Sequence, residues 1–426
     1  MAFGGSRRLV ILGFGAIGSG LFAYEAQRTG GYATPLVVDV RADLVAGLRA
    51  AAGRFRVNIA RADGVDVADV GPVDVADSTV PSDRTRVIEA IATADELASA
   101  LPSVAFYRSD AASSPHRLLA EGLRRRSLAR PLIVYCAENH RNAAALLGKA
   151  VTDELAMPER DAVRGRVRLV DTVIGKMSGI ISDPEEVAAL RLATITTDLA
   201  SAFLVEEFDR ILVARVDARG ELHPGMPVLR EVDDLAPFED AKLLGHNATH
   251  ALGAFLGELL GLRLFADLRE VPGAMGFLRT AFIEESGAVL RRRWAGADAL
   301  FTPSGYEAFA EDLLTRMVNP HLADTIDRAA RDPRRKLGWD DRLIGLIRLG
   351  LAEGVHTPRY AMGVAAGLEV LRRVDAVRAD DAELLRGCWP DGPDPEEAEK
   401  VLVAVSEGRR WLERWTAGGF RALAVV

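Results

Sequence analysis

The sequence predicts an α/β protein, with a Rossmann-type doubly wound sheet domain followed by a mostly α-helical C-terminal domain. In the first half, short apolar runs such as "RLVILGFG" and "TPLVVDV" are followed by amphipathic helical stretches, as expected of parallel strands joined by helices. In the second half, Leu, Ala, Arg and Glu recur with helical spacing. The Gly- and Pro-rich segment 217–227 resembles a linker. We therefore expect a dinucleotide-binding domain over residues 1–222 and a helical substrate-binding, catalytic domain over residues 223–426.

Length, charge and cysteine content restrict the class of protein. The chain has 426 residues, of which 49% are hydrophobic, enough for two globular domains. A net charge of -8 argues against a nucleic-acid partner. The two cysteines cannot form a disulfide framework. The first apolar run is interrupted by glycines and is too short to cross a membrane, which takes about 20 residues. We expect a cytoplasmic monomer or small homo-oligomer without a membrane partner.

The first strand leads directly into a dinucleotide-binding fingerprint. Gly13, Gly15 and Gly18 form G-x-G-x-x-G at the start of a helix, where glycines permit a tight turn, close approach of a pyrophosphate and close packing of helix on strand. Asp39 ends the next strand, where a carboxylate accepts the ribose hydroxyls and repels a 2'-phosphate. This arrangement predicts NAD rather than NADP, although Arg41 nearby could weaken the preference. The expected cofactor-binding residues are Gly13, Phe14, Gly15, Ala16, Ile17, Gly18, Asp39, Thr93 and Glu138.

A polar stripe interrupts an otherwise apolar helix over residues 242–257. At about 100° per residue, Lys242, His246, His250 and Asn247 fall near 0, 40, 80 and 140° around the helix axis, so they share one face. Leucine, alanine and phenylalanine occupy the other side and should be buried. A desolvated lysine loses its charge more readily and becomes a usable general base near neutral pH.

These residues resemble a known family. Lys242, Asn247 and His250 form K-x-x-x-x-N-x-x-H, the signature of the long-chain polyol-specific dehydrogenases, the mannitol dehydrogenase family. "CAEN", ending at Asn139, and "LVEEF" follow the family's order. "NPHLADTIDRAARDPRRKLGWDDRLI", residues 319–344, is similar to the mannitol-1-phosphate 5-dehydrogenase branch. The resemblance extends to about residue 375.

The resemblance implies a role for each position. Lys242 corresponds to the general base that takes the alcohol proton while hydride passes to NAD. Asn247 and Asn139 correspond to the pair that hydrogen-bonds the developing alkoxide, and His250 to the residue that holds a substrate hydroxyl. No metal is expected, although His246 and His250 have the spacing of two zinc ligands. Glu138 is either a proton relay or a structural carboxylate.

The substrate is less well defined than the chemistry. In the mannitol-1-phosphate branch, Arg331, Arg335 or Lys336 would bind a phosphate. The family's V-D-R-I motif is replaced here by "IGKM", residues 174–177, which puts Lys176 in a substrate-proximal segment. We expect interconversion of a polyol phosphate and a keto-sugar phosphate, of the mannitol 1-phosphate/fructose 6-phosphate type. The alternatives are a dehydrogenase of an unphosphorylated polyol, cyclitol or uronate-derived acid, and a non-catalytic NAD-binding sensor.

The arginine run at residues 124–126 has no place in this chemistry. Runs of basic residues on helices usually face solvent, and we expect that here.

Overall fold

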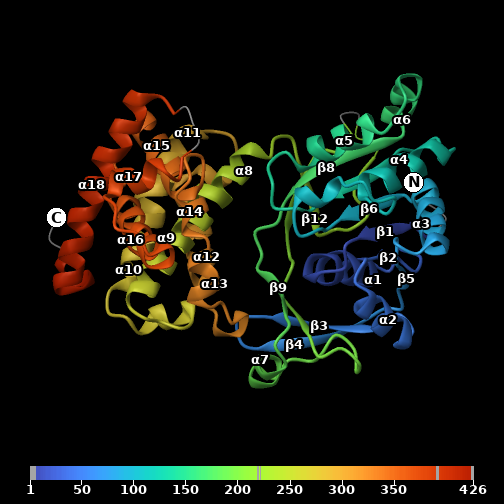
Figure 1. Ribbon diagram of the computed structural model, residues 1–426, viewed down its shortest axis with the longest axis horizontal. Coiled ribbons are helices and arrows are strands. Elements are labelled where there is room, and N and C mark those ends of the chain that lie inside the picture. Colours follow the sequence, from blue (N-terminus) through green and yellow to red (C-terminus); the bar gives the residue numbers. More distant parts are fainter. Residues whose placement is uncertain (1–5, 218–219, 221, 390–392, 424–426) are drawn as a thin grey trace. The chain divides into compact units, whose positions relative to one another are not determined.

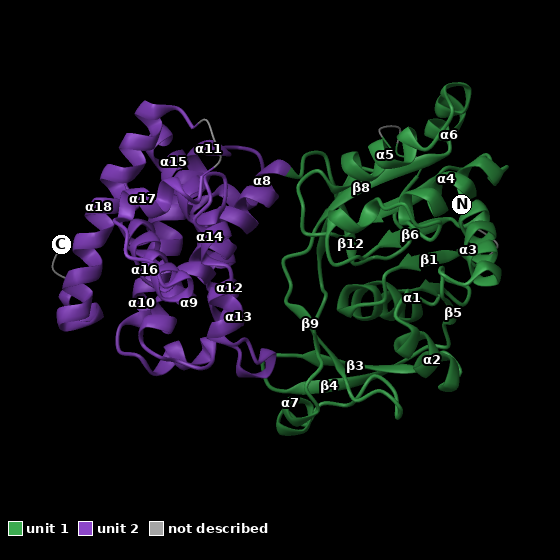
Figure 2. Ribbon diagram, viewed as in Figure 1, with its two compact units in different colours: residues 1–235 green, residues 236–426 purple. Residues whose placement is uncertain are grey.

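The computed structural model describes residues 6–217, 220, 222–389 and 393–423. The chain forms two compact units, residues 1–235 and 236–426 (Figure 2). This division lies later than the expected boundary after residue 222, because β12 (Leu229–Val232) pairs with β11 (Ile211–Ala214) and so belongs to the first unit. Of the expected linker, residues 218, 219 and 221 lie outside the described residues.

The main sheet of the first unit is the expected doubly wound sheet (Figure 1). Its strand order is β12-β11-β8-β7-β6-β1-β2-β5, parallel from β5 to β8, with β11 antiparallel to β8. The other strands are β1 (Leu9–Leu12), β2 (Leu36–Val38), β5 (Asp74–Ala76), β6 (Glu96–Ser99), β7 (Leu132–Cys136) and β8 (Val167–Val173). From β1 the chain first adds β2 and β5 on one side, and then adds β6, β7 and β8 on the other side. Sheets of this kind bind ligands where the strand order switches, here between β1 and β6.

Helices cover both faces of this sheet, so its strands β1 and β7 are buried along their whole length and almost entirely apolar. In β1, Leu9 and Ile11 join the core on one face, whereas Val10 and Leu12 join the core on the other. The helices of this unit are η1 (Gly18–Ala23), α1 (Tyr24–Thr29), α2 (Ala42–Ala50), α3 (Pro81–Thr93), η2 (Val104–Tyr107), α4 (Pro115–Arg125), α5 (Ala143–Asp153), η3 (Met157–Glu159), α6 (Arg160–Gly165) and α7 (Pro184–Ala189).

A smaller mixed sheet was not predicted. Its order is β4-β3-β10-β9, formed by β4 (Val65–Val70), β3 (Phe55–Ala60), β10 (Ala202–Glu206) and β9 (Ser178–Ile181). The ring of Phe14 meets those of Phe55 and Phe203 edge-on, at centroid distances of 4.9 and 5.9 Å. Through these ring contacts, the smaller sheet packs against the glycine-rich turn.

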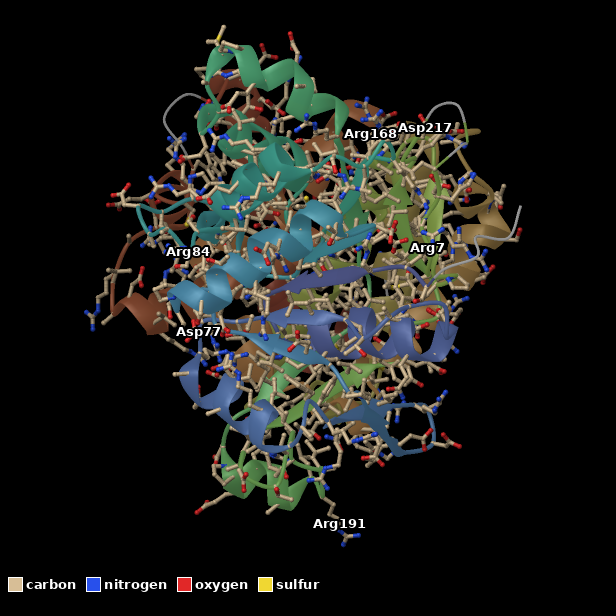
Figure 3. The ribbon with its side chains drawn as sticks, turned by 90° about the vertical axis from the view of Figure 1, so that its right-hand side faces the viewer. Arg7, Asp77, Arg84, Arg168, Arg191 and Asp217 are labelled. Carbon is tan, nitrogen blue, oxygen red and sulfur yellow. The ribbon has the colours of Figure 1, made fainter. Side chains whose placement is uncertain are left out.

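The two ends of the parallel strands lie on opposite sides of the main sheet. Figure 3 shows Arg7, which precedes β1, and Asp77, which follows β5, at opposite edges. Because the strands are parallel, the loops after β1, β2, β5 and β6 meet at the edge marked by Asp77, where ligands bind in such folds.

The second unit is helical, as expected. Over residues 236–389 and 393–423 the structure contains no strand. Side chains of α9 and α16 lie in a single large hydrophobic core, and α16 packs against both α9 and α18. Its helices are α8 (Ala236–Asp240), η4 (Ala241–Asn247), α9 (Ala248–Leu259), η5 (Phe265–Glu270), α10 (Ala274–Thr280), η6 (Ala281–Ser286), α11 (Gly287–Arg293), η7 (Ala299–Phe301), α12 (Pro303–Met317), η8 (Pro320–Leu322), α13 (Ile326–Ala330), α14 (Pro333–Lys336), α15 (Arg342–Glu353), α16 (Pro358–Asp375), α17 (Asp381–Arg386), α18 (Pro395–Gly418) and η9 (Phe420–Leu423). None of the helices in the described part of the chain is both long and apolar enough to span a bilayer.

Arg126 corrects the expectation that the arginine run faces solvent. Its side chain is only 2% exposed. The guanidinium donates hydrogen bonds to the carbonyl oxygens of Ala94 at 2.7 Å and Ala92 at 3.3 Å, where α3 ends. It also donates to Arg130 O at 2.8 Å. Arg126 therefore satisfies carbonyl groups that the end of α3 leaves without helical partners.

Replacing Arg126 by Met should lower the free energy of unfolding of the first unit by about 1–3 kcal/mol, because buried carbonyl groups would lose their donors. Arg125→Met is the matched control, since Arg125 is 49% exposed and its contact with Glu121 is long, at 3.9 Å. It should change stability by less than about 0.5 kcal/mol. Urea denaturation of both variants measures the difference. Equal stability of the two variants would contradict the assigned role of Arg126.

Candidate functional site

The glycine-rich turn after β1 has the backbone geometry that its sequence requires. Gly13 has a φ of +87°, and a Cβ there would lie 2.7 Å from the carbonyl oxygen of Ala100. A Cβ on Gly18 would lie 2.3 Å from the carbonyl oxygen of Gly13. The first glycine therefore permits the turn and the third permits the close packing of helix on strand.

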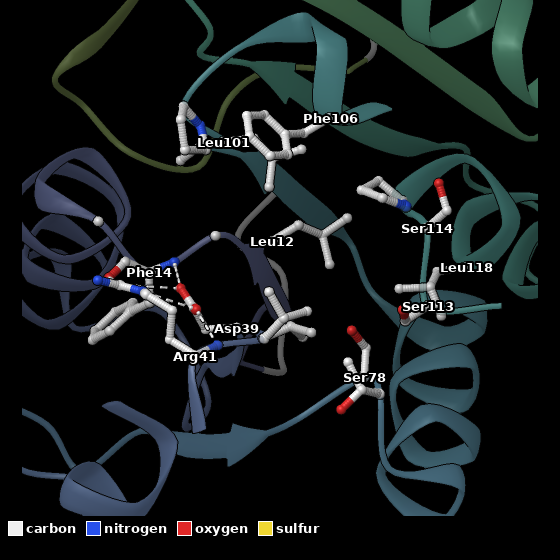
Figure 4. Close-up of a pocket in the computed structure, with 18 of the residues that line it drawn as sticks. Leu12, Phe14, Asp39, Arg41, Ser78, Leu101, Phe106, Ser113, Ser114 and Leu118 are labelled. Atoms are coloured by element: carbon white, nitrogen blue, oxygen red, sulfur yellow. Dashed lines mark hydrogen bonds and ion pairs between the residues drawn. The ribbon is translucent and has the colours of Figure 1, made fainter. Parts of the chain in front are cut away.

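Asp39 connects the end of β2 to this turn. One carboxylate oxygen accepts a hydrogen bond from the Phe14 amide at 2.8 Å, and the other accepts from the Arg41 amide at 2.9 Å. The Arg41 guanidinium adds an ion pair with Asp39 at 3.1 Å and donates to Phe14 O at 3.0 Å. Figure 4 shows Asp39 between Phe14 and Arg41. The carboxylate is thus held at the carboxyl end of β2 beside the glycine turn.

A cavity of about 580 Å³ opens at this edge of the sheet. Gly13, Phe14, Gly15 and Asp39 line it, together with Arg41. Ala16, Ile17 and Gly18 are not among the lining residues. Sequence reasoning missed a group of hydroxyl-bearing residues that line the cavity from the loops after β5 and β6: Ser78, Thr79, Ser109, Ser113 and Ser114. Their signal was the clustering of Ser and Thr: Ser78 and Thr79 closely follow β5, and the three serines lie together between η2 and α4.

Thr93 does not line the cavity. It is the last residue of α3, and its hydroxyl donates to the carbonyl oxygens of Glu89 at 3.2 Å and Ala90 at 3.3 Å. It precedes β6, whereas the cavity lies beyond the carboxyl end of that strand. Thr93 therefore lies at the opposite end of β6 from the cavity.

Glu138 is buried and does not line the cavity, but it holds residues next to the cavity in place. Its carboxylate accepts hydrogen bonds from Ser99 Oγ at 2.6 Å, from the Leu101 amide at 3.0 Å and from the Tyr107 hydroxyl. Burial raises the pKa of Glu138, although these hydrogen bonds oppose the shift. The carboxylate fixes the loop after β6, in which Leu101 lines the cavity. Asn139 follows Glu138 and is exposed.

The polar stripe of the second unit has the predicted division into two faces. Lys242, His246, Asn247 and His250 are partly exposed. The predicted inward side chains are buried, with exposed fractions of 7% or less: Leu244, Ala248, Ala251, Leu252 and Phe255. One feature differs from the expectation of a regular α-helix. The segment Ala241–Asn247 is a π-helix, in which residues five apart lie about one turn apart. Asn247 therefore lies closer to the helix side that carries Lys242 than it would in a regular α-helix.

The electrostatic environment favours neutral forms of the basic groups on this stripe. Burial lowers the pKa of Lys242 from 10.5 to about 8, and the charge of Arg342 acts in the same direction while Glu239 opposes it. Burial, with the neighbouring basic groups His250 and Arg316, lowers the pKa of His246 well below its usual value. Near pH 8, Lys242 therefore exchanges a proton readily.

His250 is held from two sides. Its Nε2 lies 2.7 Å from a carboxylate oxygen of Asp324, and its ring stacks on Phe265 at a centroid distance of 4.6 Å. The Arg328 guanidinium donates to the other oxygen of Asp324 at 2.6 Å. Asp324 lies in segment 319–344, in which the sequence indicates a role only for the basic residues.

The basic segment expected to bind phosphate divides into exposed and buried members. Arg331 pairs with Asp327 at 3.4 Å, and Arg335 pairs with Asp332 at 2.9 Å; both arginines are more than half exposed. Lys336 is only 5% exposed and donates to Arg331 O. Burial, with the charges of Arg342 and Arg335, lowers the pKa of Lys336 to about 8.

Lys176 lies in the turn between β8 and β9, where it is 12% exposed. Its amine is 2.9 Å from Asp209 and 3.9 Å from Glu206. The substituted "IGKM" segment thus carries a lysine whose charge is balanced by neighbouring carboxylates. Within the described residues, no three His, Cys, Asp or Glu side chains are grouped as metal ligands.

Comparison with known proteins assigns part of the chain. Residues 234–380 match the family model of the mannitol dehydrogenase C-terminal domain. The matched segment contains the Lys242 stripe, Asp324 and Lys336. The fold of the whole chain is similar to that of D-sorbitol dehydrogenase in substrate-free form, at a TM-score of 0.74 and 17% identity over 98% of this chain and 95% of the other. It is also similar to Pseudomonas fluorescens mannitol 2-dehydrogenase, in a ternary complex with NAD and D-mannitol, at a TM-score of 0.68 and 16% identity over 98% and 93%.

The lowered pKa of Lys242 has a direct spectroscopic test. In protein reductively methylated with ¹³C, two lysine resonances should titrate near pH 8, those of Lys242 and Lys336, and one of the two should be absent from the Lys242→Met variant. Because the pKa is lower in the folded state than the 10.5 of the free side chain, this group's contribution to folding stability should rise between pH 8 and 10.5. A Lys242 resonance that titrates above pH 10 would contradict the environment described here.

Proposed function

We propose that the chain is an NAD-dependent polyol dehydrogenase that oxidises a secondary alcohol, with Lys242 as general base. The observation that supports this most strongly is the polar stripe itself. A lysine with a pKa of about 8 shares a π-helical turn with Asn247, one turn before a fixed histidine, in the segment that matches the mannitol dehydrogenase C-terminal domain. A base with such a pKa is half ionised near the pH at which it would work.

The first unit fits NAD. The amides of the glycine turn would receive the pyrophosphate, and the Asp39 carboxylate would accept hydrogen bonds from the adenosine ribose. The cavity lies at the switch point of the sheet and has a volume suited to a ligand of this size class. When bound, NAD would supply the hydride acceptor. Arg41 is already paired with Asp39, and the carboxylate next to it disfavours a 2'-phosphate, so NAD is preferred over NADP.

Side chains of the protein would accept the alcohol proton and stabilise the negative charge that remains on the oxygen. Neutral Lys242 accepts the proton of the alcohol, and this leaves negative charge on the carbinol oxygen. Asn247 donates a hydrogen bond to that oxygen, and a single donor of this kind is worth about 3 kcal/mol in the transition state. His250 binds a neighbouring hydroxyl and thereby fixes which carbon reacts. These steps require no metal.

We further propose a phosphorylated polyol as the substrate, of the mannitol 1-phosphate type, with fructose 6-phosphate as its keto form. Lys336 and Arg342 are the buried cations of the matched segment that support this, with exposed fractions of 5% and 9%. Arg342 lowers the pKa of both Lys242 and Lys336, although its guanidinium is paired with Asp341 at 2.7 Å. A phosphate on the substrate would offset the positive charge that these cations place around the base.

An unphosphorylated polyol, cyclitol or uronate-derived acid is the second candidate. The observation in its favour is that Arg331 and Arg335 are paired with aspartates and Lys176 with Asp209. A protein that binds NAD without turnover, as a sensor, is the alternative from another class, and the altered "IGKM" segment is what favours it.

Nicotinamide absorbance followed with a panel of free and phosphorylated polyols, each with NAD and with NADP, tests these proposals. We expect turnover with NAD and polyol phosphates. Lys242→Ala should reduce kcat by at least about 1000-fold while NAD binding stays within about twofold, because the base acts on the proton and not on the cofactor. Lys149→Ala, at a lysine whose side chain is 73% exposed, is the control and should retain full activity.

Each other outcome has a defined meaning. Turnover of free polyols alone would assign the second candidate substrate class. Cofactor binding without turnover of any polyol would favour the sensor. Undiminished turnover by Lys242→Ala would remove the assigned base.

A further inference from the structure

Asp324 is a buried carboxylate that no step of the proposed chemistry uses. We propose that Asp324 is a positioning residue that fixes the tautomer and the ring orientation of His250, so that His250 accepts a hydrogen bond from a substrate hydroxyl. The consequence for substrate binding rests on the proposed function, whereas the pairing of the two side chains does not.

The geometry of the pair is that of a full hydrogen bond. His250 Nε2 and Asp324 Oδ2 are 2.7 Å apart, within the range of charge-assisted N–H to carboxylate contacts. Asp324 is only 4% exposed, so water does not compete for this oxygen. The imidazole ring lies nearly parallel to that of Phe265, with an interplanar angle of 25°. The hydrogen bond fixes one edge of the imidazole ring and the stack fixes its plane.

Asp324 is itself held in place by separate contacts. Arg328, one turn further along the chain, donates to Oδ1 from Nε at 3.1 Å and from Nη2 at 2.6 Å, which leaves Oδ2 for His250. The backbone carbonyl of Asp324 accepts from the Phe265 amide at 2.8 Å. Phe265, which stacks on His250, is therefore hydrogen-bonded to Asp324, which orients His250. Arg328, Asp324, Phe265 and His250 form one rigid group.

The ionisation of Asp324 decides which histidine nitrogen carries hydrogen. Burial raises the pKa of this carboxyl, but the hydrogen bond from His250 and the charge of Arg328 outweigh it and hold the pKa below its usual value. An ionised carboxylate only accepts hydrogen bonds, so Nε2 must be the protonated nitrogen. In neutral imidazole, Nδ1 then carries a lone pair and no hydrogen.

This assignment defines the substrate group that His250 recognises. A lone pair on Nδ1 accepts from a hydroxyl but cannot donate to a carbonyl or carboxylate oxygen. His250 would therefore select an alcohol carbon next to the reacting one, and would discriminate against substrates with a carbonyl or acid group at that place. An aspartate that only held the loop would not produce this selectivity.

The test compares Asp324→Asn with Asp327→Asn. Asp327 is the matched control: it lies nearby, is 89% exposed and pairs with Arg331. ¹⁵N NMR of histidine-labelled protein, assigned with His250→Gln, reports the tautomer without any substrate. We expect the Nε2–H form of His250 in the wild type and in Asp327→Asn. In Asp324→Asn, whose amide can also donate, a substantial Nδ1–H population should appear.

Kinetics supply the second readout. For a polyol that the wild type oxidises, Asp324→Asn should raise KM by about tenfold, change kcat less and leave NAD binding unchanged, since His250 binds a hydroxyl and does not transfer the proton. His250→Gln should show the same division between KM and kcat. If His250→Gln raises KM and Asp324→Asn does not, the positioning role is overturned.

The wild-type spectrum remains decisive if Asp324→Asn fails to fold. An Nδ1–H form of His250 in the wild type would overturn the proposal by itself. If no polyol is oxidised, the proposed function fails, but the tautomer of His250 still shows whether Asp324 positions it.

Discussion

The desolvation of the Lys242 amine is the interaction on which the proposed chemistry depends. Lys242 projects from a helix whose other side is fully buried, and its pKa falls to about 8 because burial disfavours its charge. Arg342 adds repulsion, and Glu239 keeps the shift moderate. A lysine with full solvent access would be protonated at neutral pH and could not act as a base. The proposed alcohol oxidation would therefore require the helical unit to hold the amine where water has little access to it.

The helical core provides that position through packing and buried hydroxyl groups. Thr249 donates to the carbonyl oxygen of Gly245 at 2.8 Å, within the π-helical turn, and its hydroxyl contacts that of Tyr360 at 2.7 Å. Both side chains are fully buried. These bonds satisfy a backbone carbonyl where the regular helical pattern is interrupted. The widened turn that carries Lys242 and Asn247 is thus supported from α16, across the core, and not only by its own backbone.

The sequence predicted the local structure correctly where that structure depends on neighbouring residues in the chain. Gly13 and Gly18 are required by a turn of a few residues, and the stripe from Lys242 to His250 follows from helical spacing alone. It failed where distant segments meet. The smaller sheet pairs β3 with β10, which lie far apart in the chain, and Arg126 is buried because the end of α3 needs donors. Asp324 was invisible as a partner of His250 for the same reason, and the π-helical turn leaves no periodicity by which it could be recognised.

The pH dependence of turnover tests the central claim most directly. With a polyol substrate and NAD at saturation, the oxidation rate should rise with pH and level off above an apparent pKa near 8, because the neutral amine is the base. The reverse reduction should fall above the same pH, since the ammonium form must then supply the proton. Coincident and opposite profiles are the predicted result. An oxidation rate that shows no inflection between pH 7 and 9 would contradict the assignment of Lys242 as the base.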